Sequence, residues 1–477
     1  MSRQTKTLIA STEQPKLHMD KCLIVSKVTR YEYEKHSLDN ISDAELEAVL
    51  RKRGSDFDAM LQNHREQKAF EQSVARSLGE MGRKVEMASR LTYNEDLIKW
   101  CDVVVPCGGD GTFLLAASRV RDANKPVIGF NSAPHKSVGR LCLPTWCSND
   151  VKGALHALKE GRFRWMRRSR IRTTVTCEAK LLDTITPVDL HTLHYSRYCI
   201  LSMPNTKPRR ANNWVHLNPN NLQSLQFCPT ISMYFGESVT SRVSVLRLQI
   251  DKGAWTHTKS SGLCVSTGTG STSWHYSINC LRTHSVLELM KILSREAVDT
   301  TLEKAREVAE KYNQKLMFAA GWYTYSLYTL CWKSEGGRGE IQSETHVCGR
   351  LVYLFIIHSV LELMKILSRE GIAVDTTLEK AREFAEKYNQ KLMFAADCDK
   401  LAYSVREYIT FEDWPVPRGL RVRDRADTVR VKSHCVDAGL VIDGSVSFPF
   451  NDGTEALLEI HPEDALMTVH MDDSLPY

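Results

Sequence analysis

Three glycines surround one acid in the segment Gly108-Gly109-Asp110-Gly111-Thr112. Glycines lack a Cβ, so their N–H groups can approach phosphate oxygens closely, and a helix that begins here adds the positive end of its dipole. A carboxylate beside polyphosphate is unfavourable unless it takes a proton from an attacking hydroxyl or holds Mg²⁺. The segment therefore predicts phosphoryl transfer with Asp110 at its centre. The alternative is a tight Asp-Gly turn between a strand and a helix.

Two better-known nucleotide loops differ from this segment. It lacks the GxxxxGK[ST] lysine of P-loop enzymes and the GxGxxG spacing of dinucleotide-binding domains. Simple hydride transfer is thereby disfavoured.

A second polar segment, Thr267-Gly268-Thr269-Gly270-Ser271-Thr272, follows the apolar run Leu263–Ser266. A strand that ends in such a turn offers hydroxyls and backbone amides to ribose, adenine or phosphate. A polar hairpin loop without a ligand is the alternative.

Both segments need elements to position them. Apolar runs predict strands at residues 21–27, 103–105 and 127–130, and helices over 44–61 and 113–120. Strand, glycine segment, helix and strand in this order indicate a parallel α/β domain. From about residue 163 the sequence predicts a second, mainly antiparallel β domain, with strands at 170–176, 243–250, 263–266, 401–405, 436–442 and 446–450.

Composition sets further limits. The chain has 477 residues, 42% hydrophobic and 25% charged, with a net charge of +6, which predicts two or three folded domains and no nucleic-acid partner. The densest basic cluster alternates with apolar residues, which favours a solvated or phosphate-facing edge strand over a nucleic-acid-binding stripe; it comprises Arg162, Arg164, Arg167, Arg168, Arg170 and Arg172.

Cysteine usage and hydropathy exclude other classes of protein. The 14 cysteines form no CxxC pair, which predicts a reducing compartment and no protein-held metal site. The strongest apolar stretch, residues 351–357, is too short to span a membrane. Residues 1–20 are weakly basic, which is compatible with a residual transit segment.

One segment occurs twice. Residues 284–296 recur unchanged at 358–370, and residues 297–320 recur at 373–396 with Val308 replaced by Phe384. Two near-identical copies indicate a recent duplication or a gene-model error rather than a solenoid. A core of native density holds one such apolar helix pair, so we expect residues 321–357 to be poorly ordered or extruded. Excision of 297–370 would leave one copy that runs into the strand at 401–405.

Taken together, the motifs resemble the NAD kinases. The resemblance rests on GGDGT after a strand, on TxTGSTxW at 267–274, and on the closing Asp443-Gly444 and 448–453 stretch. Residues 27–32, 139–144, 162–165 and 236–238 are similar to the mitochondrial branch of that family. It implies a Rossmann-like parallel α/β domain joined to an antiparallel β-rich domain.

The resemblance also implies roles for residues. Asp110 would act on the 2′-hydroxyl of the adenosine ribose of NAD. Phosphate or ATP contacts would come from Gly108, Gly109, Gly111, Thr112 and Arg30, and NAD contacts from Asn131, Thr267, Thr269, Ser271 and Thr272. ATP would be the donor, Mg²⁺ the counter-charge, a homodimer the assembly and the mitochondrion, otherwise the cytoplasm, the location. We expect a flexible segment at 1–20, an ATP-binding domain at 21–160, a β-rich domain with the duplication (284–320 and 358–396) at 161–450, and a returning segment at 451–477.

One departure from the family pattern affects the acceptor site. Where the family carries an Asn-Glu pair that holds NAD, this chain has Ile231-Ser232, and residues 204–233 are unusually rich in Asn and Pro. Two alternatives therefore stay open: a catalytically impaired homologue that binds nucleotide or serves as a dimer partner, and a lipid kinase with a GGDG loop.

Overall fold

The computed structural model describes residues 16–38, 41–90, 92–176, 188–189, 215–217, 224–238, 242–283, 285–287, 289, 308, 378–409, 421–444 and 446–472. These form two compact units, Met1–Arg168 with Glu463–Tyr477, and Ser169–Pro462. Each unit is described by itself. Residues 321–357, which we expected to be poorly ordered or extruded, and most of the predicted segment 1–20 lie outside the described residues.

The first unit is built on a parallel sheet in the order β2-β1-β3. Its strands are β1 (Lys21–Ser26), β2 (Lys84–Ser89) and β3 (Val103–Cys107). All of β3 and all but the first residue of β1 are buried, as continuous apolar strands of a covered parallel sheet should be. The strand predicted at 127–130 is present as two parallel bridges to β3, at Val127 and Phe130.

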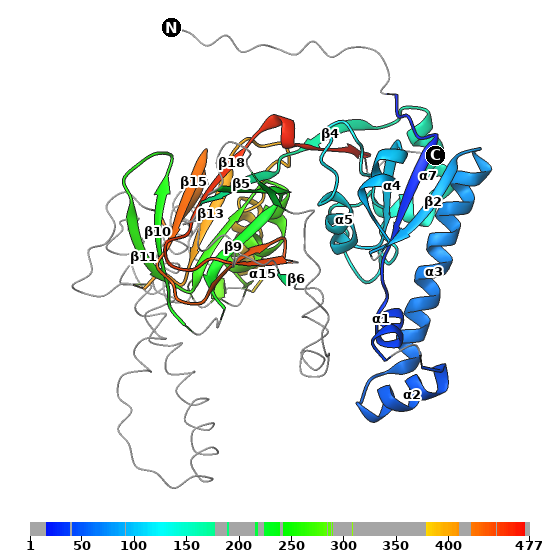
Figure 1. Ribbon diagram of the computed structural model, residues 1–477, viewed down its shortest axis with the longest axis horizontal. Coiled ribbons are helices and arrows are strands. Elements are labelled where there is room, and N and C mark those ends of the chain that lie inside the picture. The colour runs from blue at the N-terminus through cyan, green and yellow to red at the C-terminus, as the bar shows by residue number, and fades with distance from the viewer. Residues whose placement is uncertain are drawn as a thin grey trace. The chain divides into compact units, whose positions relative to one another are not determined.

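Helices flank this sheet (Figure 1). They are α1 (Arg30–Ser37), α2 (Asp43–Lys52), α3 (Phe57–Glu80), α4 (Glu95–Trp100), α5 (Asp110–Ala117), α6 (Thr145–Asn149) and α7 (Val151–Lys159). Capping boxes start α1 and α2, where Thr29 pairs with Glu32 and Ser42 with Glu45. The long helix α3 contacts β1, β2 and α7, and so positions much of the unit.

A strand from far along the chain completes the first unit. β19 (Leu466–His470) pairs antiparallel with β4 (Arg164–Arg168), and the Val127 N–H donates to the Met467 carbonyl at 2.9 Å. The basic cluster predicted as one edge strand is thus divided. Its first part forms β4, whereas Arg172 lies in β5 (Ile171–Thr176) of the second unit.

The second unit is a pair of seven-stranded sheets, ordered β11-β10-β15-β18-β5-β8-β7 and β14-β13-β12-β9-β16-β17-β6. Every pairing among these described strands is antiparallel. The strands are β6 (Val188–Asp189), β7 (Val215–Leu217), β8 (Ser224–Thr230), β9 (Ser232–Glu237), β10 (Ser244–Ile250), β11 (Thr256–Ser260), β12 (Gly262–Ser266), β13 (Leu401–Arg406), β14 (Arg423–Ala426), β15 (Thr428–Ser433), β16 (Ala438–Ile442), β17 (Val446–Pro449) and β18 (Glu455–Ile460).

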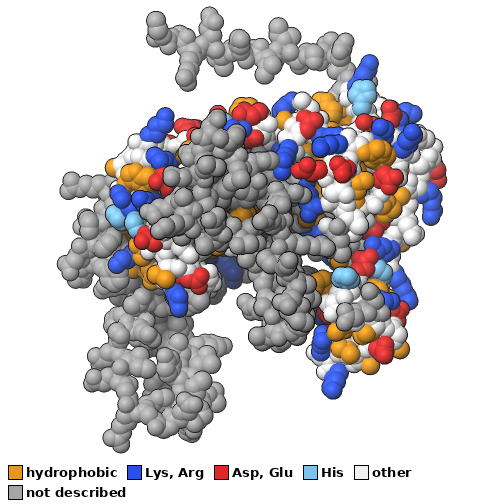
Figure 2. All heavy atoms as spheres, in the orientation of Figure 1, with side chains coloured by type: hydrophobic (Ala, Val, Ile, Leu, Met, Phe, Trp, Pro, Cys, Tyr) orange, Lys and Arg blue, Asp and Glu red, His pale blue; other side chains and the backbone are white. Residues whose placement is uncertain are grey.

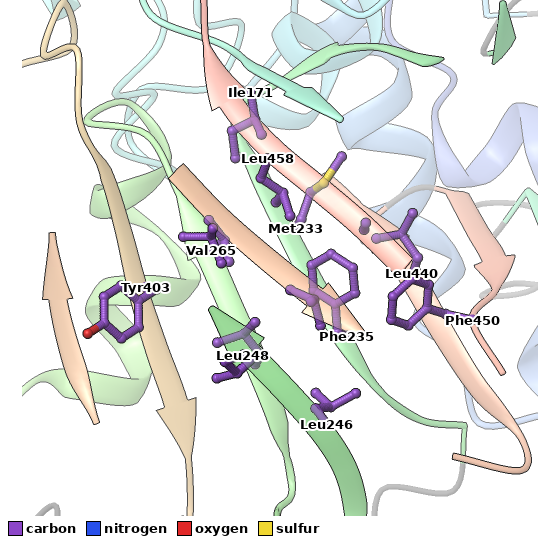
Figure 3. Packing of buried hydrophobic residues seen from close by; sticks show 14 of the residues in the cluster. Ile171, Met233, Phe235, Leu246, Leu248, Val265, Tyr403, Leu440, Phe450 and Leu458 are labelled. Carbon is purple, nitrogen blue, oxygen red and sulfur yellow. The ribbon is translucent and has the colours of Figure 1, made fainter. Parts of the chain in front are cut away.

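The core of this unit lies between the facing sides of the two sheets (Figure 3). Leu246, Leu248 and Leu458 come from one sheet, and Phe235 and Val265 from the other. The predicted fold class, a parallel α/β domain followed by an antiparallel β-rich domain, is confirmed.

Short helices connect the strands of the second unit, and the last of them, η2, leads from β18 to β19. They are η1 (Gly270–Thr272), α10 (Trp274–Asn279), α15 (Leu378–Gln390) and η2 (Pro462–Asp464). α15 belongs to the second copy of the duplicated sequence. The side-chain amide of Asn389 holds the segment before the first copy, because it accepts from Leu281 N–H at 2.8 Å and donates to the Leu281 carbonyl at 2.9 Å.

The described surface is mixed in charge. On the face shown in Figure 2, lysine and arginine side chains are interspersed with aspartate and glutamate. In the described part of the chain, no helix is both long and apolar enough to cross a membrane.

Candidate active site

The glycine segment connects the end of β3 to the start of α5. Gly109 is the N-cap of α5 and Asp110 lies in its first turn. A Cβ at Gly108 would collide with Thr112 Oγ1, so glycine is required for the tight passage from strand to helix. No heavy atom lies within 4 Å of the Cβ that Gly111 lacks, which leaves space beside that backbone. The structure thus places these residues at a helix N-terminus, where an anion is favoured.

Two backbone N–H groups hold the carboxylate of Asp110. Oδ1 accepts from Leu141 N at 2.9 Å, and Oδ2 accepts from Arg140 N at 3.2 Å. Such bonds fix the direction of a carboxylate. The side chain is half-buried, so a held anion with some access to solvent lies at the end of β3.

Two further groups interact electrostatically with Asp110. Burial raises the pKa of the Cys142 thiol to about 12, and the Asp110 charge adds to this shift. Desolvation lowers the pKa of the Arg168 guanidinium, and Asp110 opposes this by favouring the cation. The Asp110 charge therefore acts on both a buried thiol and a desolvated guanidinium.

Asn131 organises the loop that delivers the Arg140 and Leu141 amides. Its side chain is 2% exposed; Nδ2 donates to the Ser137 carbonyl at 2.8 Å and Oδ1 accepts from Ala133 N at 3.1 Å. Gly139 has a φ of +60°, and a Cβ there would lie 2.5 Å from Asn131 Nδ2. The structure therefore connects Asn131 to Asp110 through this loop. Its predicted contact with NAD stays a prediction.

A buried amide that the sequence did not single out supports the other side of the glycine segment. Gln67, on α3, donates through Nε2 to the Cys107 carbonyl at 3.0 Å and to Glu71 Oε1 at 2.7 Å. Its Oε1 accepts from Ser132 Oγ at 2.6 Å. Gln67 thus ties the end of β3 to the residue after Asn131. The sequence feature that could have revealed this contact is the pair of polar residues Gln67 and Glu71, four positions apart on the buried face of α3.

Arg30 lies at the start of α1 rather than in β1. Among the described residues its hydrogen bonds go to Ser55 Oγ, at 3.0 Å, and to Glu34 Oε1, at 3.4 Å. The side chain is 51% exposed, so it is available to solvent but does not contact the glycine segment. Its predicted contact with ATP phosphates stays a prediction.

The hydroxyl-rich turn Thr267–Thr272 lies in the second unit between β12 and α10. Its hydroxyls are largely used within the turn: Ser271 Oγ donates to the Gly268 carbonyl at 2.6 Å, and Thr272 Oγ1 donates to the Thr269 carbonyl at 3.2 Å. Thr267 donates through N, at 2.9 Å, and through Oγ1, at 3.3 Å, to the Ile231 carbonyl. The turn is therefore rigidly folded.

The residues after α15 pack against this turn. Phe394 N donates to Ser271 Oγ at 3.3 Å, and a Cβ at Gly268 would collide with the Ala395 carbonyl oxygen. The second copy of the duplicated sequence thus supplies this contact.

The Ile231-Ser232 position, where the family motif is absent, is held by an acid. Asp443 Oδ1 accepts from Ile231 N at 3.2 Å, Ser232 N at 2.8 Å and Ser232 Oγ at 3.3 Å. Sequence reasoning used Asp443 only as part of a motif and missed this contact.

Among the described residues, no group of three or more His, Cys, Asp and Glu side chains could hold a metal ion. Asp110 supplies a carboxylate within the glycine segment. That donor set fits Mg²⁺ bound chiefly by substrate phosphates, as Mg²⁺ often is.

Comparison with known proteins identifies the family. The ATP-NAD kinase N-terminal domain, as a family profile, matches residues 22–163. NAD kinase 2, mitochondrial, from Homo sapiens is 30% identical over 453 residues, which cover 94% of this chain and 83% of that protein. The chain belongs to the NAD kinase family.

Another relative from the NAD kinase family gives the same result. NAD kinase 2, mitochondrial, from Xenopus tropicalis is 30% identical over 471 residues, covering 94% of this chain and 90% of that protein. A crystal structure of yeast NADH kinase complexed with NADH covers 96% of this chain and 85% of its own at 10% identity, with a TM-score of 0.43. That likeness is too distant to place any residue.

Proposed function

We propose that this chain transfers the terminal phosphoryl group of ATP to the 2′-hydroxyl of the adenosine ribose of NAD, giving NADP. The observation that carries the proposal is the Asp110 carboxylate, held by two backbone N–H groups at the start of the helix that follows the glycine segment. Family membership and the family names of the relatives support the same reaction.

Asp110 acts as the base in this mechanism. Its carboxylate takes the proton of the ribose 2′-hydroxyl while that oxygen bonds to the terminal phosphorus of ATP and the bond to the ADP oxygen breaks. The amides of Arg140 and Leu141 keep the carboxylate directed before the reaction.

The proposed binding roles are divided between ATP and NAD. The residues proposed to hold the ATP phosphates are Gly108, Gly109, Gly111, Thr112 and Arg30. Those proposed to hold NAD are Asn131, Thr267, Thr269, Ser271 and Thr272. Mg²⁺ supplies neutralising charge to the phosphates. We also propose a homodimer, and a mitochondrial location in keeping with the names of the relatives.

A second candidate is a homologue that binds NAD but turns it over poorly. Ile231-Ser232 favours it, since this pair lacks the polar side chains of the family's Asn-Glu. Loss of two such contacts weakens binding by several kcal/mol, at about 1.5–3 kcal/mol for each hydrogen bond to a charged group.

The test uses the full chain with Mg²⁺, ATP and either NAD, NADH or diacylglycerol as acceptor. NADP is measured with an NADP-specific dehydrogenase, and NAD binding by calorimetry. ATP-dependent NADP formation supports the proposed function. NAD binding without product identifies the second candidate, and phosphorylation of diacylglycerol alone identifies a lipid kinase.

A further inference from the structure

Asp443 connects the turn between β16 and β17 to the start of β9. It lies between β16 and β17, where Asp443 and Gly444 have φ values of +45° and +65°. Its backbone N–H donates to the Ser232 carbonyl at 3.0 Å, and Oδ1 receives the three bonds from Ile231 and Ser232. The contact is thus made in both directions, between residues 211 and 212 positions apart.

One peptide group connects this carboxylate to the hydroxyl-rich turn. The peptide between Ile231 and Ser232 donates its N–H to Asp443 at 2.8 Å, and its carbonyl accepts from Thr267 N at 2.9 Å and Thr267 Oγ1 at 3.3 Å. A Cβ at Gly270 would collide with the same carbonyl oxygen. Hydrogen bonds on the two sides of one peptide polarise and strengthen each other.

We propose that Asp443 is a positioning residue for NAD: through the Ile231–Ser232 peptide it holds the Thr267–Thr272 turn in its binding conformation. This inference rests on the proposed function, which assigns that turn to NAD. In this chain Ile231 has no polar side chain and Ser232 has a short one. The turn is therefore held through the backbone of these two residues, and the carboxylate that holds it comes from β16–β17.

The charge of Asp443 gives this role a pH dependence. Burial raises the pKa of Asp443 to about 6, against the opposing effect of the Ser232 and Ile231 N–H donors and of Arg170. Among the described residues, Arg170, which is 2% exposed, acts on Asp443 through its positive charge. An ionised carboxylate accepts hydrogen bonds more strongly than the neutral acid. The three hydrogen bonds to Oδ1 are therefore strongest above about pH 6. For the chain as a whole the sign is the opposite, because a raised carboxyl pKa means that the free energy of unfolding falls as pH rises through 6.

Three variants separate the possible outcomes. Asp443→Gly removes the carboxylate but suits the positive φ, and Asp443→Asn keeps an acceptor oxygen without titrating. Asp251→Gly is the matched control, because Asp251 also has a positive φ, of +49°, and its Oδ1 accepts from the backbone N–H groups of Asp427 and Thr428. The KM for NAD, the KM for ATP and kcat are measured from pH 5.5 to 8.5, with hydrogen exchange of the turn amides.

We expect Asp443→Gly to raise the KM for NAD roughly tenfold, with little change in kcat or the KM for ATP, the scale of a lost hydrogen bond to a charged group. In the unaltered protein the KM for NAD rises below pH 6, and Asp443→Asn removes that rise. An unchanged KM in Asp443→Gly, or the same pH profile in Asp443→Asn, overturns the inference.

Hydrogen exchange separates failure of this inference from failure of the proposed function. The Thr267 and Ser271 amides donate within this network, so Asp443→Gly should speed their exchange even in a chain with no kinase activity. An inactive chain with faster exchange refutes the function alone. Unchanged exchange in Asp443→Gly refutes the positioning role.

Discussion

Replacement of Asp110 by asparagine should remove catalysis and leave the fold in place. Asparagine keeps one acceptor oxygen, so one of the two bonds at 2.9 and 3.2 Å survives, while the other N–H faces the new NH₂ group. Arg140 is exposed, so water can replace the acceptor that its N–H loses. We expect the free energy of unfolding to fall by about 1 kcal/mol. Loss of the base should lower kcat by about 10²- to 10⁴-fold.

The assay compares Asp110→Asn with Asp102→Asn in the same unit. Asp102 also caps a backbone N–H, that of Lys21 at 2.8 Å, at the start of β1. Both variants should melt within a few degrees of the unaltered chain, at roughly 2–4 °C for each kcal/mol in a cooperative unit of about 150–250 residues. Only Asp110→Asn should lose NADP formation, measured with the coupled dehydrogenase. A kcat for Asp110→Asn within threefold of the unaltered chain, on the scale of general-base effects, would refute the role of the carboxylate.

Three further changes test other contacts. Gly139→Ala places a methyl group against Asn131 and strains a positive φ, so we expect a stability loss of about 1–3 kcal/mol and a lower kcat, seen by thermal melting and initial rates. Asn389→Ala should lower the free energy of unfolding by about 1–2 kcal/mol, because it removes two hydrogen bonds to buried backbone. The matched variant in the first copy is Asn313→Ala, and an equal loss there, measured by urea unfolding, would contradict the assignment of this contact to the second copy. With its pKa raised to about 12 by burial, the Cys142 thiol should resist iodoacetamide at pH 8 until the chain unfolds, and rapid labelling of its peptide in the native protein would count against that burial.

Strands buried on both faces could be predicted from the sequence, because an apolar run needs no partner to be recognised. The run at 22–25 and the run before Gly108 both form the predicted strands. β2 was missed because it is an edge strand of the three-stranded sheet, and its KVEMAS sequence has one fully buried residue. Such a strand is defined by its pairing with β1 rather than by its own pattern.

The site could be predicted only where its chemistry is local. The glycines and the acid of the GGDGT segment are adjacent in sequence, and the structure places them together at the start of α5. The groups that hold them are distant: the Leu141 amide is 31 residues from Asp110, and Gln67 is 40 residues from Cys107. These contacts depend on how the loop 131–141 and α3 pack, which periodicity does not report.

The duplicated sequence shows the same limit. The two copies are nearly identical, so the sequence predicted that one helix pair packs in the core but could not indicate which copy supplies it. The structure assigns the Leu281 and Ser271 contacts to the second copy, whose end lies directly before β13 in the chain. A short connection restricts where a helix can pack, and this favours the copy next to β13.

Pairing of β19 with β4 has a consequence for synthesis on the ribosome. Residues up to Arg168 emerge first, but the strand that completes their unit is translated only after the whole of the β-rich unit. During elongation, the β4 edge of the nascent α/β unit is therefore unpaired, and the Val127 N–H lacks its Met467 acceptor. Exposed edges of this kind are the surfaces that chaperones bind and that aggregate when release is delayed. The order of translation thus makes the α/β unit the last to be finished.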